Sequence, residues 1–301
     1  MKYFVSFGLL AALAALLLIK TDATQEKVAT DIHGDFACEI PLLSFEEADF
    51  DRVIDGEVFS QTLVISGPEW NNTLIKNCRV HDTEGDGIVV RDVSNVIITD
   101  CSFENIGGQA AVRGSITGGT DGVVLYKNRV KHTAENGFNF GQRSAQAIDH
   151  TNLKIIGNTI DDTGREEGSG LAHGMYIQAQ DFEITHNTIT GSRDGNGISV
   201  RSSGLISCNT IAGKSASNKP GIRYYSDHQR GESNSLIIER NTITGSRVGI
   251  DLFSPVKRYD GFGGYDHVVT NFTISNNTIQ DSTTPVSVAV EYTRDPFVVT
   301  K

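Results

Sequence analysis

The feature that most constrains the fold of this 301-residue chain is a recurring triplet of Asn, a polar residue and an apolar residue. Successive Asn residues of the triplet are 22 to 36 positions apart. A period of this size indicates a structural unit that buries its apolar side only by stacking on neighbouring units. The copies are Asn128-Arg129-Val130, Asn158-Thr159-Ile160, Asn187-Thr188-Ile189, Asn209-Thr210-Ile211, Asn241-Thr242-Ile243 and Asn277-Thr278-Ile279, with Cys78-Arg79-Val80 and Cys101-Ser102-Phe103 in the same place earlier.

A second pattern alternates with the first and consists of a Gly followed by apolar residues at the first and third places. Each apolar run is only three to five residues long, β-branched, and bounded by Gly, Asn or Asp, which favours strands over helices. A third short alternating run, such as 153–156, precedes each Asn. The Gly copies begin at Gly87, Gly137, Gly174, Gly197, Gly221 and Gly249, with a weaker copy at Gln109.

Stacked parallel strands lie about 4.8 Å apart, so the repeated Asn residues are expected to form a column whose amides hydrogen-bond along it. The pattern resembles the right-handed parallel β-helix proteins of the pectate-lyase-like superfamily over about residues 71–290. This resemblance implies an all-β, single-domain right-handed parallel β-helix, a solenoid of about eight to ten coils. We assign residues 57–293 to the β-helix, 24–56 to an N-terminal cap over its open end, and 294–301 to a C-terminal tail.

The first 23 residues have the organisation of a secretory signal peptide. Met1-Lys2 precede an apolar run from Phe4 to Ile19, and small residues end the segment at Ala23. The run is shorter than the roughly 20 residues of a membrane span. We therefore expect a secreted or periplasmic protein with no membrane association after signal cleavage; an uncleaved anchor is the alternative.

The net charge of −11 argues against a nucleic-acid partner. An acidic protein that binds a polyanion must concentrate Lys and Arg at one place.

Four cysteines, Cys38, Cys78, Cys101 and Cys208, are too few and too scattered to indicate a disulfide framework, and they lack metal-ligand spacing. Cys78 and Cys101 fall at the same place in adjacent coils, with Cα atoms about 4.8 Å apart. That spacing fits a disulfide, and it also fits two reduced cysteines at the positions that Asn occupies in later coils.

Strand alternation turns the residue after each Gly inward and the next one outward. The outward row is expected to contain Val89, Ala111, Asn139, Tyr176, Ser199, Arg223 and Asp251, with Arg91 and Arg113 in the following row as solvated surface. Inserts in neighbouring coils predict walls around this face. We expect one exposed patch made of Asn136, Asn139, His173, Tyr176, Gln178, Arg201, Arg223 and Tyr225.

This patch suits cleavage of a uronic-acid polymer by β-elimination, in which a base removes the C5 proton and an acid protonates the leaving oxygen. The neighbouring carboxylate must be neutralised, and Arg201, Arg223, Lys214 and Lys219 carry the necessary charge. His173 is the natural acid or base near neutral pH. Asn136, Asn139, Gln178 and Tyr225 complete the expected substrate-binding residues.

The motif His173-Gly174-Met175-Tyr176, with Lys residues in a loop about two coils later, resembles single-domain β-helix alginate lyases of polysaccharide lyase family 31. The resemblance implies a catalytic pair of Tyr176 with Lys219 or Lys214; we prefer Lys219, which lies beside Pro220-Gly221. We expect a monomer that acts on an anionic polysaccharide without a cofactor. The outward rows supply no carboxylate cluster, so no catalytic metal is expected.

Three alternatives remain open. A glycoside hydrolase needs clustered acids, and Ala172-His173-Gly174 only partly matches a Gly-His-Gly motif. A uronan C5-epimerase uses the same proton abstraction, although its usual Asp-Pro-His-Asp motif is absent. A non-enzymatic carbohydrate-binding rod predicts no convergent ionisable groups on the outward face.

Overall fold

In a computed structural model of the protein, the described residues are 38–141, 150–165, 168–212, 219–225, 235–254, 269, 271–290 and 298–300. The expected signal peptide (1–23), the first part of the expected cap (24–37) and Lys214 lie outside them. Within the described ranges, no helix has the length and apolar character needed to span a membrane.

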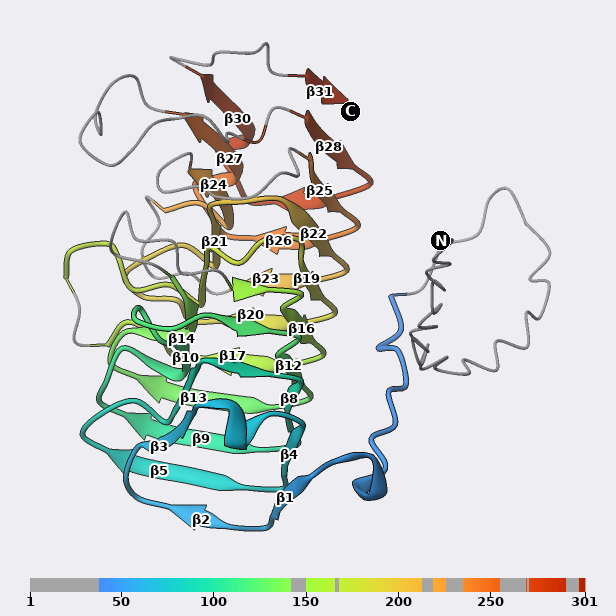
Figure 1. Ribbon diagram of the computed structural model, residues 1–301. Coiled ribbons are helices and arrows are strands. Elements are labelled where there is room, and N and C mark those ends of the chain that lie inside the picture. The colour runs from blue at the N-terminus through green and yellow to red at the C-terminus, as the bar shows by residue number, and fades with distance from the viewer. Residues whose placement is uncertain are drawn as a thin grey trace, which may run out of the picture. The chain divides into compact units, whose positions relative to one another are not determined.

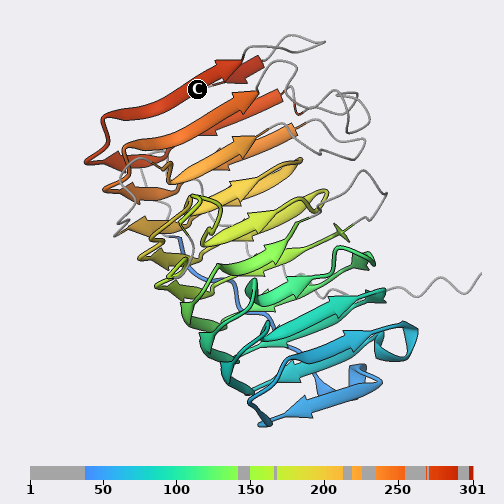
Figure 2. The ribbon, with the colours of Figure 1, turned by 90° about the vertical axis from the view of Figure 1, so that its left-hand side faces the viewer.

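The described chain winds through three parallel sheets, and each coil contributes one strand to each sheet (Figures 1 and 2). The fold is a single-domain, all-β parallel β-helix, as the repeats predicted. Sheet A contains β1 (Arg52–Asp55), β4 (Thr73–Lys76), β8 (Val96–Thr99), β12 (Val124–Tyr126), β16 (Lys154–Ile156), β19 (Phe182–Thr185), β22 (Gly204–Ser207), β25 (Ser235–Glu239), β28 (Asn271–Ser275) and β31 (Val298–Thr300).

Sheet B follows the turn that carries the Asn residues, and sheet C follows the Gly residues. Sheet B contains β2 (Val58–Phe59), β5 (Arg79–Thr83), β9 (Ser102–Ile106), β13 (Arg129–Thr133), β17 (Thr159–Asp161), β20 (Thr188–Thr190), β23 (Thr210–Ala212), β26 (Thr242–Thr244) and β29 (Thr278–Gln280). Sheet C contains β3 (Leu63–Ser66), β6 (Ile88–Arg91), β10 (Ala110–Gly114), β14 (Asn136–Phe140), β18 (Met175–Ile177), β21 (Ile198–Val200), β24 (Ile222–Tyr225), β27 (Val248–Ser254) and β30 (Thr284–Val290).

A small fourth sheet and two short 3₁₀ helices complete the described elements. The fourth sheet lies between sheets C and A and contains β7 (Val93–Ser94), β11 (Thr120–Asp121) and β15 (His150–Thr151). The 3₁₀ helices are η1 (Glu47–Asp49) and η2 (Pro68–Trp70). At both ends the ladder extends past the sequence boundaries, because β1 lies in the expected cap and β31 in the expected tail.

The core is filled from the inward row of each sheet. The residue after each repeat Gly is fully buried, as the alternation predicted: Ile88, Phe138, Met175, Ile198, Ile222 and Ile250. Ile155, Ile184 and Ile206 of sheet A face the same interior, as do Ile160, Ile189 and Ile211 of sheet B. At about 25 cal/mol per Å² of apolar surface, this burial is the main favourable contribution to folding.

The repeated Asn residues form the expected hydrogen-bonded column at the turn from sheet A to sheet B. Asn187 accepts from the backbone N–H and the amide of Asn158, at 2.8 and 2.9 Å, through its Oδ1. Its own Nδ2 donates to the carbonyl of Ile155 and to Oδ1 of Asn209. The same pattern runs from Asn128 to Asn277. Each buried backbone N–H at this turn is thereby satisfied by the next coil.

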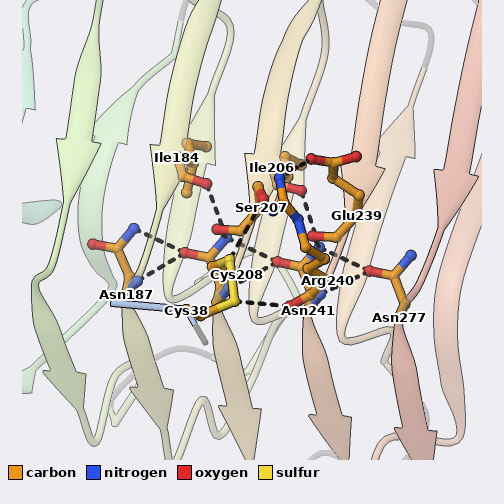
Figure 3. Close-up of a disulfide and its surroundings, with 11 residues drawn as sticks. Cys38, Ile184, Asn187, Ile206, Ser207, Cys208, Glu239, Arg240, Asn241 and Asn277 are labelled. Atoms are coloured by element: carbon orange, nitrogen blue, oxygen red, sulfur yellow. Dashed lines mark hydrogen bonds and ion pairs between the residues drawn. A yellow bond between two sulfur atoms is a disulfide. The ribbon is translucent and has the colours of Figure 1, made fainter. Parts of the chain in front are cut away.

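Cysteine replaces Asn at the start of this column. Cys101 donates its backbone N–H to Asn128, and its sulfur accepts from the backbone N–H of Cys78. Cys78 and Cys101 also form a disulfide with their Cα atoms 4.6 Å apart, which settles the alternative left open by the sequence. A second disulfide joins Cys38 to Cys208 beside the column (Figure 3). The expectation that the four cysteines are too few and too scattered for a disulfide framework is therefore wrong, because the fold brings together residues 170 positions apart.

Residues 38–50 of the expected cap, which precede β1, lie along the turns between sheets A and B; we call this segment the strap. From its disulfide with Cys208, the strap passes Tyr126, whose hydroxyl donates to the Pro41 carbonyl at 2.9 Å, and reaches an ion pair between Glu47 and Lys76. The strap crosses five coil steps, about 24 Å, with nine residues that span about 30 Å when extended. The part of the strap between Cys38 and Glu47 is thus close to extended. It covers Tyr126, which stands at an outward position yet is buried.

Replacing Asn187 by Ala should lower the free energy of unfolding by about 2–4 kcal/mol, because the substitution leaves buried N–H and C=O groups of two coils without partners. The measurement is chemical denaturation under oxidising conditions. Thr188→Ala, one position along and exposed, is the matched control and should change stability by less than about 0.5 kcal/mol. Equal losses in the two variants would contradict the role of the column.

Replacing Cys38 by Ser should free the strap while the coils stay folded. A glutamate-specific protease should then cleave at Glu39, Glu46 or Glu47 at least about tenfold faster, since a disulfide typically contributes 2–4 kcal/mol. Cys101→Ser removes the other disulfide without touching the strap and serves as the control. If both variants were cleaved in the strap at the same rate, the disulfide would not be what holds it.

Candidate functional site

The residues expected to form one patch lie on or beside four adjacent strands of sheet C. The pairing aligns Asn139 of β14 with Tyr176 of β18, then with Ser199 of β21, Arg223 of β24 and Asp251 of β27. Asn136 is the first residue of β14, and His173 comes two residues before β18. Gln178, Arg201 and Tyr225 follow at the far ends of the strands. The predicted alignment of Asn139, Tyr176, Ser199, Arg223 and Asp251 on successive strands is confirmed.

The register predicted for β10 is wrong by two residues. Arg113, and not Ala111, pairs with Val89 and with Asn139. The cause is that Ala111, rather than Gln109, takes the place of the repeat Gly in this coil. Arg113 is consequently not free surface: its Nε donates to Asp86 at 2.7 Å.

The patch is less exposed than predicted. Asn136 and His173 are 3% exposed, Arg201 7% and Gln178 8%. Tyr176, Asn139, Arg223 and Tyr225 keep part of their surface in solvent. The alternation gives the direction of a side chain but not its neighbours, and these side chains bend over the sheet to contact each other.

Tyr176 is the side chain around which the site is packed. Its ring stacks on the imidazole of His173, with centroids 5.6 Å apart and planes 16° from parallel. The guanidinium of Arg201 lies 4.9 Å from the ring centroid. The ring also covers Gly141, where a Cβ atom would come within 2.1 Å of it. An imidazole, a cation and a glycine therefore fix the orientation of the phenol.

Arginine and aromatic side chains alternate from this point across the next coils. Arg201 lies 4.9 Å from the ring of Tyr225, and Arg223 lies 5.1 Å from Tyr225 and 4.9 Å from Phe253. Such cation–π contacts contribute about 0.5–2 kcal/mol each, more when they are desolvated. Arg223 also pairs with Asp251 at 3.1 Å, while Arg201 donates to Ser199 Oγ at 2.8 Å.

Lys219 reaches back from the start of β24 to the loop that leads into β18. A Cβ atom at Gly170 would lie 2.3 Å from its Nζ, so the ammonium occupies the space that this glycine leaves. Gly170 is three residues before His173. Sequence reasoning missed Gly141 and Gly170 as parts of the site, since nothing in the sequence distinguishes them from ordinary loop glycines.

An ionic cluster anchors the start of the loop before His173. Asp162 forms ion pairs with Arg165 and Arg193 and a hydrogen bond with His132. Burial opposes ionisation of this carboxyl, but the hydrogen bond with His132 and the charge of Arg193 outweigh burial and hold its pKa below the usual value. Across the described residues, no group of three or more His, Cys, Asp or Glu side chains is placed to hold a metal ion.

Comparisons with known proteins agree with this architecture. The family model for the "Right handed beta helix region" matches residues 68–211, and the fold is a right-handed parallel β-helix. The sequence matches no curated protein.

Two of the solved structures that are similar to the chain have TM-scores above 0.5. The catalytic unit of a thermostable GH87 α-1,3-glucanase from Streptomyces thermodiastaticus has a TM-score of 0.55 and 16% identity, over 83% of this chain and 47% of that one. The A-module of a mannuronan C-5 epimerase from Azotobacter vinelandii has a TM-score of 0.51 and 15% identity, over 77% of this chain and 63% of that one. The chain spans less than two thirds of either structure, and at this identity the likeness shows the fold alone.

Introducing a methyl group at Gly141 should force the ring of Tyr176 out of its position, because the nearest ring atom would be 2.1 Å away. We expect Gly141→Ala to cost about 1–3 kcal/mol of stability, the usual range for overpacking. At Gly168 a Cβ meets no atom within 4 Å, so Gly168→Ala is the matched control. Denaturation curves of the two variants decide; equal stability would mean that the ring does not occupy this position.

Proposed function

We propose that the protein is a secreted or periplasmic, monomeric enzyme that cleaves a uronic-acid-containing polysaccharide, of the alginate or polyglucuronate type, by β-elimination. The observation that carries the proposal is the phenol of Tyr176, held on sheet C between His173 and the cation of Arg201. The two disulfides support export, because such bonds persist in oxidising compartments.

The substrate class is argued first from charge. In a chain of net charge −11, Arg201 and Arg223 stand on neighbouring strands of one face, and Lys219 lies at the adjacent loop. Concentrated positive charge on an acidic protein suits an anionic polymer. The two similar structures are named as enzymes of α-1,3-glucan and mannuronan, which supports a polysaccharide substrate more generally.

In the proposed reaction, a base takes the proton from C5 of the uronate, and nearby cations stabilise the negative charge that spreads onto the carboxylate. The electron pair then forms the C4–C5 double bond as the C4–O bond breaks, and the leaving oxygen takes up a proton. The products are an unsaturated uronate and a new chain end. We assign the two proton transfers to Tyr176 and Lys219, because the His173–Tyr176 motif resembles that of single-domain β-helix alginate lyases.

The competing chemistries differ at identifiable points. An epimerase removes the same C5 proton but returns one to the opposite face without breaking C4–O. A hydrolase requires two carboxyl groups beside the bond, whereas on the described part of this face Asp251 is paired with Arg223 and Asp86 with Arg113. A binding rod would leave the polymer unchanged.

The purified protein should produce the absorbance of unsaturated uronates when incubated with alginate or polyglucuronate; polygalacturonate and hyaluronan complete the panel. Tyr176→Phe and Lys219→Ala should each lower kcat by about 10²–10⁴-fold, the usual contribution of a general acid or base. Lys154→Ala, on sheet A and away from this face, is the control and should be fully active.

Each contrary result points to one alternative. No absorbance rise with any uronate polymer would contradict the lyase. New reducing ends without unsaturation would favour hydrolysis, and deuterium uptake at C5 without cleavage would favour epimerisation. Full activity of both Tyr176→Phe and Lys219→Ala would contradict the site while leaving the reaction class intact.

A further inference from the structure

A second ladder of side chains runs along the start of the sheet C strands. At this place a side-chain acceptor of one coil receives the backbone N–H of the next coil. Asp86 Oδ1 accepts from Ala110 at 3.0 Å, Asn136 Oδ1 from His173 at 2.8 Å, and the Nδ1 of His173 from Asn196 at 2.8 Å. The column reads Asp86, Ala110, Asn136, His173, Asn196 and Pro220.

The two gaps in the ladder follow from residue chemistry. Ala110 has no side-chain acceptor, and the N–H of Asn136 bonds instead to the carbonyl of Gln109 at 3.0 Å. Pro220 has no N–H to donate, so the ladder ends at Asn196. Each remaining step from one coil to the next needs a side-chain acceptor at this position. His173 supplies this acceptor, as Asn136 does one coil earlier.

This hydrogen bond determines the state of His173. A ring nitrogen that accepts an N–H carries no proton, so the proton of the neutral imidazole is on Nε2. The buried ring is held by its bond with Asn196 of the next coil, while the backbone N–H of His173 donates to Asn136 of the previous coil. The face of the ring lies against Tyr176.

Charged groups of the described chain lie close to this histidine. Asp194 accepts from the backbone of Ala172, the ammonium of Lys219 lies at Gly170, and Arg201 lies over Tyr176. Tyr176 is itself a titratable group, and its ring is in direct contact with the imidazole.

We propose that His173 is a positioning residue rather than an acid or base of the reaction: its ring, held by the ladder, sets the plane of Tyr176. The inference rests on the proposed function for its catalytic consequence, but its structural part stands independently. It replaces the expectation that His173 transfers a proton.

Because the ladder member is an imidazole, the arrangement is also sensitive to acid. Protonation of Nδ1 replaces the acceptor by a second donor pointing at the N–H of Asn196. The folded state thus resists a proton that the unfolded chain accepts near pH 6.5. The stability contributed by this bond is present above that pH and declines as the pH falls below it.

Two variants separate the hydrogen-bond acceptor of the His173 side chain from its aromatic ring. His173→Asn keeps a ladder acceptor, as its neighbours Asn136 and Asn196 do, but removes the ring. His173→Phe keeps a ring beside Tyr176 but leaves the N–H of Asn196 without an acceptor. Stability is measured by denaturation between pH 5 and 8, and kcat and KM by the uronate assay.

We expect His173→Asn to keep the unfolding constant of the wild type at pH 8 within about threefold, and His173→Phe to raise it about 5- to 100-fold. Below about pH 6.5, the wild-type unfolding constant should rise more steeply than that of His173→Asn, by up to tenfold per pH unit. His173→Asn should lower kcat about 10- to 100-fold with little change in KM, and should keep the acid limb of the pH–rate profile. His173→Phe should retain kcat within about tenfold.

The proposal would be overturned if His173→Phe lost as much kcat as Tyr176→Phe, or if His173→Asn abolished the acid limb, since both results identify a proton carrier. Equal destabilisation by Asn and Phe would contradict the ladder role. If the wild type proved inactive on every uronate, the proposed function would fail, and the stability measurements would still decide whether His173 is a ladder residue.

Discussion

The position of each side chain in this protein depends on hydrogen bonds that lock the register between one coil and the next. Backbone pairing holds parallel strands about 4.8 Å apart, but the turns between sheets leave backbone N–H groups that no strand partner can satisfy. At the turn from sheet A to sheet B, the column from Asn128 to Asn277 satisfies them. At the start of sheet C, Asp86, Asn136 and His173 do the same. A slip of one residue in any coil would break both sets of bonds and would also turn its apolar residues outward.

The candidate site is a consequence of this locked register. Asn139, Tyr176, Ser199 and Arg223 are far apart in the sequence, yet pairing places them on successive strands. At the site, ring stacking is added to the hydrogen bonds that join the coils at the start of sheet C. His173 is bonded to coils on both sides and lies against Tyr176, which in turn contacts Arg201. Rigidity needed for the fold and orientation needed for chemistry are thus supplied by the same residues.

The sequence predicted the parts of the structure that repeat. Period and alternation were sufficient to predict the Asn column, the inward row and the gathering of Tyr176, Arg201 and Arg223 on one face, because each follows from stacking alone. Two predictions failed where the chain departs from the repeat. The register of β10 was misjudged because Ala111 replaces a repeat Gly. The pairing of Cys38 with Cys208 was missed because the strap lies outside the repeat. Burial of Arg201 and His173 was also missed, since it depends on how side chains bend over the sheet and not on their direction from the backbone.

The central functional claim is that this face removes the C5 proton of a uronate and eliminates the C4 substituent. The most direct test is proton NMR of an oligouronate incubated in D2O with the wild type and with Tyr176→Phe. The account predicts that the vinyl H4 signal of an unsaturated uronate appears with the wild type and is lost, or slowed about 10²-fold or more, with Tyr176→Phe. A substrate spectrum that stays unchanged with the wild type, or a vinyl signal that grows equally fast with both proteins, would contradict it.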